Sequence, residues 1–407
     1  MKLNKLLLAL AASGIATSAF ATNGYFSHGN GMTAKGMGGA ATAMTKDAFG
    51  GANNPATMVW VGNRYDAGVD AFSPVRAASA TSGSTVTSSD NELFAVPEFG
   101  YNKMQNDKMS FGVTVYGNGG MNTDYKTTSG YNMLGGTTAL GVDLIQLIVA
   151  PTVSYKVNET TSVGLSPLLG YQRFEAYGLG AFAGYSAAPS ALTNNGTDDA
   201  TGFGARVGIL SKLNNQVTVG AAYSTKVDMS KFDKYAGLFA EQGNFDLPVN
   251  WNIGANFQPN DKLAIAVDFQ RIEYSGVKAI NNPSANLLSG NSLGANAGPG
   301  FGWSDMDIVK LGVEYKHSPT MTLRAGYSHT DAPMTSADVT FNVLAPAVIE
   351  DHITLGMTYA MDKDSDLTVS YAHAVENTIT GNYLLGSGTG TIKMHQNSIG
   401  IAYSKKF

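Results

Sequence analysis

The sequence predicts an all-β protein, a transmembrane antiparallel β-barrel of about 14 strands with an N-terminal plug inside it. Three observations lead to this fold class: apolar side chains recur with a period of two from about residue 63, short and long connections alternate, and the last strand ends on an aromatic residue. Barrels in bacterial outer membranes have these features. We expect three parts, residues 1–21, 22–62 and 63–407.

Residues 1–21 have the features of a secretory signal peptide. Two lysines precede the apolar run Leu6–Ala12, and the small-residue site Ala19-Phe20-Ala21 follows it. The run is too short for a spanning helix, which needs roughly 20 apolar residues. We expect cleavage between Ala21 and Thr22 and a mature protein that crosses the outer membrane several times.

Composition narrows the class of protein. Removing residues 1–21 takes away two lysines and no acids, so the formal charge changes from −5 to −7, and we expect no nucleic acid partner. The chain has no cysteine, which excludes disulfides and thiolate metal sites. Its 48 Gly, 19 Tyr and 18 Phe are unusual for a soluble enzyme and fit a membrane barrel.

The period of two defines the strands. Ile353, Leu355, Met357 and Tyr359, for example, share one face of a strand, and small or polar residues share the other. The expected strands span residues 63–76, 92–105, 108–122, 140–157, 160–175, 201–213, 216–229, 247–258, 262–275, 303–317, 320–330, 350–361, 366–377 and 391–407.

The connections favour a membrane barrel over a soluble β-sandwich, because alternation alone fits both. About 15 to 28 residues separate the strands at one end, whereas tight turns connect them at the other, as in barrels with long extracellular loops and short periplasmic turns. The tight turns are Asn106-Asp107, Asn158-Glu159, Asn214-Asn215, Pro259-Asn260-Asp261, Ser318-Pro319 and Asp362–Ser365.

The last strand places Ile399, Ile401, Tyr403 and the terminal Phe407 on one face. A barrel without a free edge needs a last strand that pairs with the first. A terminal aromatic residue in this pattern also resembles the assembly signal of outer-membrane proteins.

Residues 22–62 do not follow the strand pattern. They are too rich in glycine for a long strand and too poor in charge for a soluble disordered tail, so we expect a compact plug inside the barrel. The segments that stand out are Asn23-Gly24-Tyr25-Phe26, Gly36-Met37-Gly38-Gly39-Ala40 and Asn54-Pro55-Ala56.

These segments resemble the FadL family, which includes long-chain fatty acid transporters and aromatic-hydrocarbon channels. The resemblance continues in family order over essentially the whole mature chain. The later matching segments are Leu247-Pro248-Val249, Tyr274-Ser275, Gly302-Trp303-Ser304-Asp305 and Thr322-Leu323-Arg324-Ala325-Gly326-Tyr327.

The resemblance implies a fourteen-stranded barrel closed by an N-terminal hatch. It also implies an apolar capture groove among the third and fourth outer loops, a tighter pocket near the hatch, and a side exit at an inward kink in the third strand. Transport through such a barrel requires no energy source. The implied ligand is a hydrophobic small molecule, foremost a long-chain fatty acid, and the alternative is an aromatic or alkane hydrocarbon.

The third strand contains the candidate lateral opening. After Phe111, Val113 and Val115 it reaches Gly117-Asn118-Gly119-Gly120, where missing side chains make a bulge or bend easy. The alternative is that these glycines make room for a neighbouring aromatic ring.

Apolar residues on two outer loops are candidates for ligand capture. In the fourth loop, 230–245, aromatic residues at helical spacing behind Ser230 and Asp233 predict a short amphipathic helix. Exposed apolar groups are costly unless they cover a ligand or one another, so a capture groove and simple loop packing are both open. The candidates are Leu179, Phe182, Tyr185, Leu192, Phe232, Tyr235, Leu238 and Phe239.

Charged residues should face the lumen if apolar neighbours such as Val69, Val207, Phe269, Val313 and Leu323 face lipid. They would form structural ion pairs between plug and wall, or one cation among Arg206, Lys310 and Arg324 would bind a ligand carboxylate. The predicted inward charges are Asp66, Asp70, Arg206, Asp268, Lys310, Glu314 and Arg324.

Other activities find little support. The Gly29–Ala34 pattern G-x-G-x-x-A lacks the β-α-β context of nucleotide binding, and the six histidines lack metal-site spacing. A barrel hydrolase would need His395 and Ser398 together, but three residues apart on one strand they face opposite sides. A general porin would need an open lumen. We expect no enzyme activity, cofactor or metal, and a monomer that contacts outer-membrane lipid and lipopolysaccharide.

Overall fold

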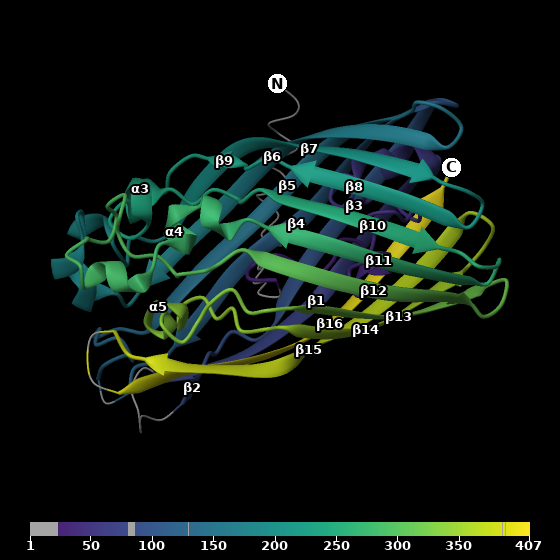
Figure 1. Ribbon diagram of the computed structural model, residues 1–407. Coiled ribbons are helices and arrows are strands. Elements are labelled where there is room, and N and C mark those ends of the chain that lie inside the picture. The colour runs from purple at the N-terminus through teal and green to yellow at the C-terminus, as the bar shows by residue number, and fades with distance from the viewer. Residues whose placement is uncertain (1–22, 80–85, 129, 385, 387) are drawn as a thin grey trace.

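Figure 1 shows a computed structural model of the chain, a closed antiparallel β-barrel. The structure describes residues 23–79, 86–128, 130–384, 386 and 388–407. The expected signal peptide and the cleavage position between Ala21 and Thr22 lie outside the described residues. No helix in the described ranges is long and apolar enough to cross a bilayer.

Fourteen long strands form the barrel wall, which confirms the number and order expected from the sequence. Two short strands, β2 (Thr87–Ser88) and β9 (Asp228–Met229), pair with β1 and β7. The wall strands are β1 (Arg64–Ser79), β3 (Phe94–Asn106), β4 (Met109–Tyr125), β5 (Leu140–Lys156), β6 (Thr161–Tyr177), β7 (Asp198–Lys212), β8 (Val217–Ser224), β10 (Asn250–Phe257), β11 (Leu263–Ile272), β12 (Met306–Lys316), β13 (Met321–Thr330), β14 (Asp351–Ala360), β15 (Ser365–Asn382) and β16 (Thr389–Lys406). The expected ends differ most at β8, which ends at Ser224 instead of residue 229, and at β15, which ends at Asn382 instead of residue 377.

The barrel closes where the first and last wall strands meet. β1 pairs with β16 along its whole length, with Val69 opposite Ile401, so neither strand has a free edge. Beyond β16, the Phe407 N–H donates to the Asn63 carbonyl at 3.2 Å, and its ring stacks on Tyr101 with centroids 5.8 Å apart. The terminal aromatic therefore lies at the seam of the closed barrel.

The alternation of side chains places apolar residues outside and charges inside. Val69, Val207 and Leu323 are exposed on the outer face, whereas Asp70 and Arg206 are buried inside. An apolar outer band is what the hydrocarbon core of a membrane requires. All seven predicted inward charges are buried: Asp66, Asp70, Arg206, Asp268, Lys310, Glu314 and Arg324.

Tight turns join the strands at the end of the barrel that carries the C-terminus, and the long loops lie at the opposite end (Figure 1). This arrangement confirms the predicted asymmetry of the connections. Besides β2 and β9, the described parts of the long loops contain short helices: η2 (Gly180–Tyr185), η3 (Pro189–Ala191), η4 (Asp233–Tyr235), α3 (Ala240–Gly243), η5 (Tyr274–Gly276), α4 (Lys278–Asn281), η6 (Ser284–Leu287) and α5 (Val339–Asn342).

Residues 23–62, called the N-terminal segment below, cross the barrel lumen. Helix α2 (Met32–Lys35) packs against β14, β15 and β16, while η1 (Pro55–Trp60) packs against β4 to β7 on the opposite side of the lumen. At the start of η1 the Asn54 side chain accepts a hydrogen bond from the Ala56 N–H, and Pro55 occupies the first helical position.

Inward glycines let the N-terminal segment approach the wall closely. A Cβ atom on Gly208 of β7 would lie 2.0 Å from Oδ1 of Asn54, and one on Gly326 of β13 would lie 2.0 Å from the Gly38 nitrogen. Any larger residue would push the segment away, so glycine is required for this packing.

Candidate functional site

Buried ion pairs join the N-terminal segment to the wall. Lys35 Nζ lies 2.8 Å from Asp70 Oδ2 and 3.6 Å from Glu98 Oε2, and all three side chains are buried. Removing one partner of such a pair would leave an uncompensated buried charge, which is strongly destabilising. These contacts are structural ion pairs between the N-terminal segment and the wall, one of the two alternatives that the sequence predicts for the inward charges.

Glu314 of β12 binds two cations at once. Its carboxylate lies 2.7 Å from Lys46 Nζ of the N-terminal segment and 2.8 Å from an Arg324 nitrogen of β13. The charge of Arg324, one of the three candidate carboxylate partners, is therefore already compensated by the protein itself.

Arg206 and Lys310 line a small polar cavity of about 40 Å³ beside the N-terminal segment. Arg206 donates hydrogen bonds to Ser224 Oγ, the Asn53 carbonyl and Asn250 Oδ1, and it forms no ion pair with any described residue. Lys310 Nζ donates to the His28 carbonyl at 3.1 Å. Two of the three candidate cations thus share one cavity.

An aromatic cluster holds the start of the N-terminal segment under the outer loops. The Tyr274 hydroxyl donates to the Asn23 carbonyl at 2.6 Å and accepts from the Tyr25 N–H at 3.2 Å. Tyr274 also packs edge-on against Trp303 at 5.2 Å, and Tyr25 lies 6.0 Å from both Trp303 and Phe245. This cluster is buried and continuous with the apolar core beneath the loops.

The backbones of β3 and β4 are unpaired along part of the wall. Their pairing ends where Phe99 faces Val115, and no described residue from Phe94 to Glu98 pairs with β4. The pairing of β4 with β5 has a bulge between Gly117 and Gly119. The predicted opening thus coincides with a bulged stretch of the third wall strand, as missing side chains allow.

Other segments contact β4 along and beyond this unpaired stretch. The Gly120 N–H donates to the Tyr25 carbonyl at 3.2 Å, and Phe26 forms a β-bridge with Gly119. Further out, the Asp90 N–H donates to the Asp124 carbonyl at 2.9 Å. We call the unpaired stretch between β3 residues 94–98 and β4 residues 116–123 the wall window.

Comparison with known proteins places this barrel in a family. A family model described as outer membrane protein transport protein (OMPP1/FadL/TodX) matches residues 8–405. The chain belongs to this family. It is an outer-membrane protein, as expected from the sequence.

Relatives of this OMPP1/FadL/TodX member include transport proteins from several bacteria. The long-chain fatty acid transport protein of Escherichia coli K12 is 26% identical, over 91% of this chain and 92% of the relative. Outer membrane protein P1 of Haemophilus influenzae is 22% identical, over 68% of this chain and 65% of the relative.

Solved structures show the same fold. The toluene transporter TodX of Pseudomonas putida is 20% identical with a TM-score of 0.73, covering 95% of this chain and 100% of that one. A Pseudomonas aeruginosa FadL homologue is 16% identical with a TM-score of 0.71, covering 94% and 100%.

The predicted capture residues of this family member pack into its apolar core. Tyr185 is the exposed member of the set, and Leu238 packs at the edge of the core. Leu238 and Phe239 line an apolar cavity of about 30 Å³ together with Phe174 and Phe341. The fully buried candidates are Leu179, Phe182, Leu192, Phe232, Tyr235 and Phe239.

The prediction of a short amphipathic helix in the fourth loop is wrong. The loop contains only the three-residue η4 and the four-residue α3, in which Glu241 and Gln242 have positive φ angles of 59° and 58°. Left-handed residues interrupt a helix, and no described side chain caps η4. The helical spacing has another cause: three rings of the loop gather around Phe174 of β6, at 4.7 to 5.5 Å.

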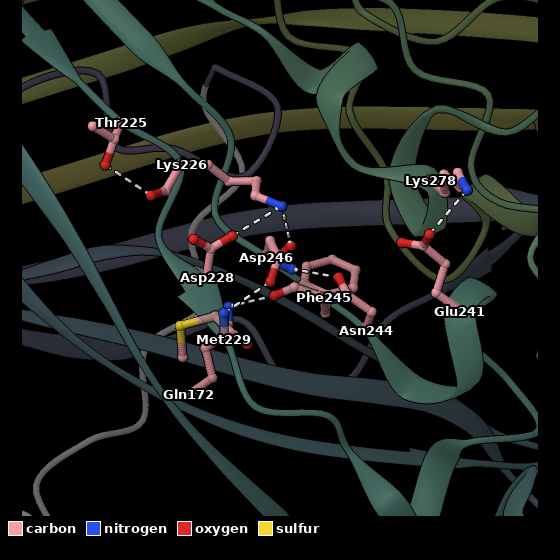
Figure 2. A network of polar contacts seen from close by, with 10 residues as sticks. All are labelled: Gln172, Thr225, Lys226, Asp228, Met229, Glu241, Asn244, Phe245, Asp246 and Lys278. Carbon is pink, nitrogen blue, oxygen red and sulfur yellow. Dashed lines mark hydrogen bonds and ion pairs between the residues drawn. The ribbon is translucent and has the colours of Figure 1, made fainter.

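Polar contacts fix the base of the fourth loop, as Figure 2 shows. Lys226 Nζ lies 2.8 Å from Asp246 and 3.0 Å from Asp228, and Gln172 of β6 donates to the Phe245 carbonyl at 3.0 Å. Hydrogen bonds to Asp246 and then Asp228 raise the pKa of Lys226 to about 12, which keeps the ammonium charged.

Sequence reasoning missed several residues that build the site. Asn118 lay within the predicted opening, but its place beside the polar cavity with Asn250 and Asn252 gave no signal in the sequence. In the sequence, Tyr274 and Trp303 stand out only as parts of family segments. Arg76 is not among the predicted inward charges, although it shares its parity on β1 with Phe72 and Asp70.

Proposed function

We propose that this chain takes up hydrophobic small molecules, foremost long-chain fatty acids, across the outer membrane by passive diffusion. The ligand is captured at the extracellular loops and leaves sideways through the wall window into the membrane. The observation that carries this proposal is the wall window itself: β3 and β4 separate at Phe99 and Val115, while the N-terminal segment occupies the lumen.

The energetics favour lateral exit. A ligand that crossed the lumen into the periplasm would lose about 25 cal/mol for every Å² of apolar surface that it exposed to water. A long acyl chain that passes through the wall exchanges an apolar pocket for an apolar bilayer. Exit of the ligand into the bilayer therefore needs no energy source.

The apolar core supports a route from the loops to the window. One continuous cluster of buried residues connects Leu179 and Phe239 in the loops with Tyr25 and Phe26, and Phe26 bridges Gly119 at the window. Small shifts of these side chains would open a path along the cluster. Residues 22–62 act in this proposal as the hatch that blocks direct passage.

The polar cavity beside the hatch supports a role in binding a carboxylate. Arg206 and Lys310 both line it, and Arg206 has no protein carboxylate among the described residues as a partner. Arg324 is the weaker candidate, because Glu314 already neutralises it.

The alternative ligand is an aromatic or alkane hydrocarbon. Rings of Phe174, Phe239, Phe301 and Phe341 line the apolar cavity beneath the loops, a setting that suits a ligand without a charged group.

A barrel hydrolase finds no support in the positions of Ser398 and His395. Ser398 is buried against Asp70, while His395 lies on the opposite face of β16 beside Glu376. A general porin would need the lumen that the hatch fills. We expect a monomer surrounded by outer-membrane lipid and lipopolysaccharide.

Uptake of radiolabelled palmitate, 1-hexadecanol and toluene by cells that lack their own family members tests the proposal. Cells that produce the barrel should take up at least one ligand faster than cells with an empty vector, and sugar-driven liposome swelling should not increase. Equal uptake of all three ligands with and without the barrel would overturn it.

A further inference from the structure

We propose that Arg76 and Tyr125 form a binding site for the carboxylate of a single-chain amphipathic ligand at the outer border of the wall window. This inference rests on the proposed function and adds a head-group site to the exit route. It concerns a different part of the lumen from the cavity of Arg206 and Lys310.

Arg76 is a buried cation that has no acidic partner among the described residues. Its side chain points inward from β1 and is 2% exposed, and it forms no ion pair within the described part of the chain. Its guanidinium donates to Ser89 Oγ at 3.1 Å and to the Asn91 carbonyl, while its Nε has no hydrogen-bond partner in the described ranges. Glu92, the residue after Asn91, has an exposed side chain and forms no ion pair with Arg76. Burial of an uncompensated charge is costly, and an anionic ligand would offset that cost.

Tyr125 supplies a second unused donor from the other side of the window. It lies on β4, is fully buried, and its hydroxyl has no hydrogen-bond partner among the described residues. Ser89 Oγ accepts hydrogen bonds from the Arg76 guanidinium at 3.1 Å and from the N–H of Asp124, the residue before Tyr125, at 3.0 Å. A guanidinium Nε–H and a phenol O–H are donors that a carboxylate accepts.

The backbone places both groups at the outer border of the window. The Ser89 N–H donates to the Arg76 carbonyl at 2.9 Å, and Ser89 Oγ accepts from the Asp124 N–H at 3.0 Å. Ser89 therefore links β1 to β4 above the stretch where β3 and β4 are unpaired. Arg76 and Tyr125 come from the two strands that this link joins.

Apolar surface leads from this site along the window. The Arg76 guanidinium lies over the Phe94 ring, 5.8 Å from its centroid, and Phe94 packs with Phe72 and Val96 on the inner face of β1 and β3. Met121 belongs to the separate apolar core on the β4 side. A cation at one end and an apolar surface beside it fit a ligand that has one charged head group and one acyl chain.

A comparison of palmitate with 1-hexadecanol, which has the same chain length and no charge, tests the site. The variants are Arg76→Met, Arg76→Lys and Tyr125→Phe, with Arg173→Met as a control that removes an exposed cation at the outer end of β6. A hydrogen bond to a charged group corresponds to roughly a tenfold effect or more. We expect Arg76→Met to lower the ratio of palmitate to hexadecanol uptake about tenfold and Tyr125→Phe to lower it less. Arg76→Lys should retain part of the ratio, and Arg173→Met should leave it unchanged.

Each outcome has one meaning. Equal losses of palmitate and hexadecanol uptake in Arg76→Met would mean that Arg76 only holds residues 89–91 in place, and this result would overturn the proposal. An unchanged ratio of palmitate to hexadecanol uptake in both Arg76→Met and Tyr125→Phe would also overturn it. Wild-type uptake of hexadecanol above the empty-vector control tests the proposed function separately. Heat-modifiability of each variant on gels reports whether the barrel has folded.

Discussion

Replacing Asp268 by alanine should release part of the N-terminal segment from the wall. Oδ2 of Asp268 accepts three hydrogen bonds, from the N–H groups of Ala41 and Thr42 at 2.8 and 2.9 Å and from Thr42 Oγ1 at 2.7 Å. The side chain is 4% exposed, so alanine would leave three buried donors without their acceptor. At roughly 1–3 kcal/mol for each donor, the segment would lose about 3–9 kcal/mol of the free energy that holds it in place.

Hydrogen exchange of amides 40–44 in the purified barrel measures this loss. Since 1.4 kcal/mol corresponds to a factor of ten, exchange in Asp268→Ala should be about 100-fold faster or more. Asp268→Asn, which keeps one carbonyl acceptor, should give an intermediate rate. Asp307→Ala, on the exposed Arg271 pair, is the control and should exchange like wild type. Wild-type exchange in Asp268→Ala would refute the reasoning that this carboxylate anchors the segment.

Three further predictions concern the hatch, the seam and the window. Deleting residues 22–50 should leave a barrel that inserts and conducts ions strongly in planar bilayers, because the lumen loses its filling; conductance no larger than wild type would contradict a hatch. Removing Phe407 should lower the amount of barrel in the outer membrane more than it lowers transport by the inserted molecules, because its ring and N–H lie at the closing seam. A normal amount of barrel in the outer membrane would disprove this role of Phe407. In Gly119→Val the new Cβ would lie 1.9 Å from the Tyr25 carbonyl oxygen, so residues 25–27 should shift. Ligand uptake should then fall while the amount of barrel stays normal, and unchanged uptake would contradict a role of this contact in transport.

The strands could be predicted from the sequence because the membrane imposes a simple rule on them. Lipid outside and a polar lumen inside require alternation, and this alternation identified every wall strand. Closure of β1 on β16 followed from the terminal strand for the same reason, since an open edge is not tolerated in a bilayer.

The loops and the hatch contacts could not be predicted, because distant residues decide them. The spacing of Phe232, Tyr235 and Phe239 suggested a helix, yet the rings are held by Phe174 of β6. Likewise, nothing near Gly208 in the sequence indicates that Asn54 approaches it. Tertiary packing overrides local patterns at such positions.

The candidate site was predictable only in part. The glycines at 117–120 indicated the place of the wall window, because missing side chains are a local feature of the sequence. Whether each inward cation has an acidic partner depends on the fold, so Arg324, Arg206 and Arg76 could not be told apart before the structure was known.

Reversible closure of the wall window tests lateral exit most directly. If the register of Phe99 with Val115 continued, Pro97 would face Gly117, so the variant Pro97→Cys/Gly117→Cys places two thiols across the window in a chain that has no cysteine. A cleavable bis-maleimide can then join β3 to β4, and each single variant serves as its control. We predict that cross-linking blocks uptake of radiolabelled palmitate and that cleavage of the linker restores it. Undiminished uptake by fully cross-linked barrels would contradict lateral exit through this window.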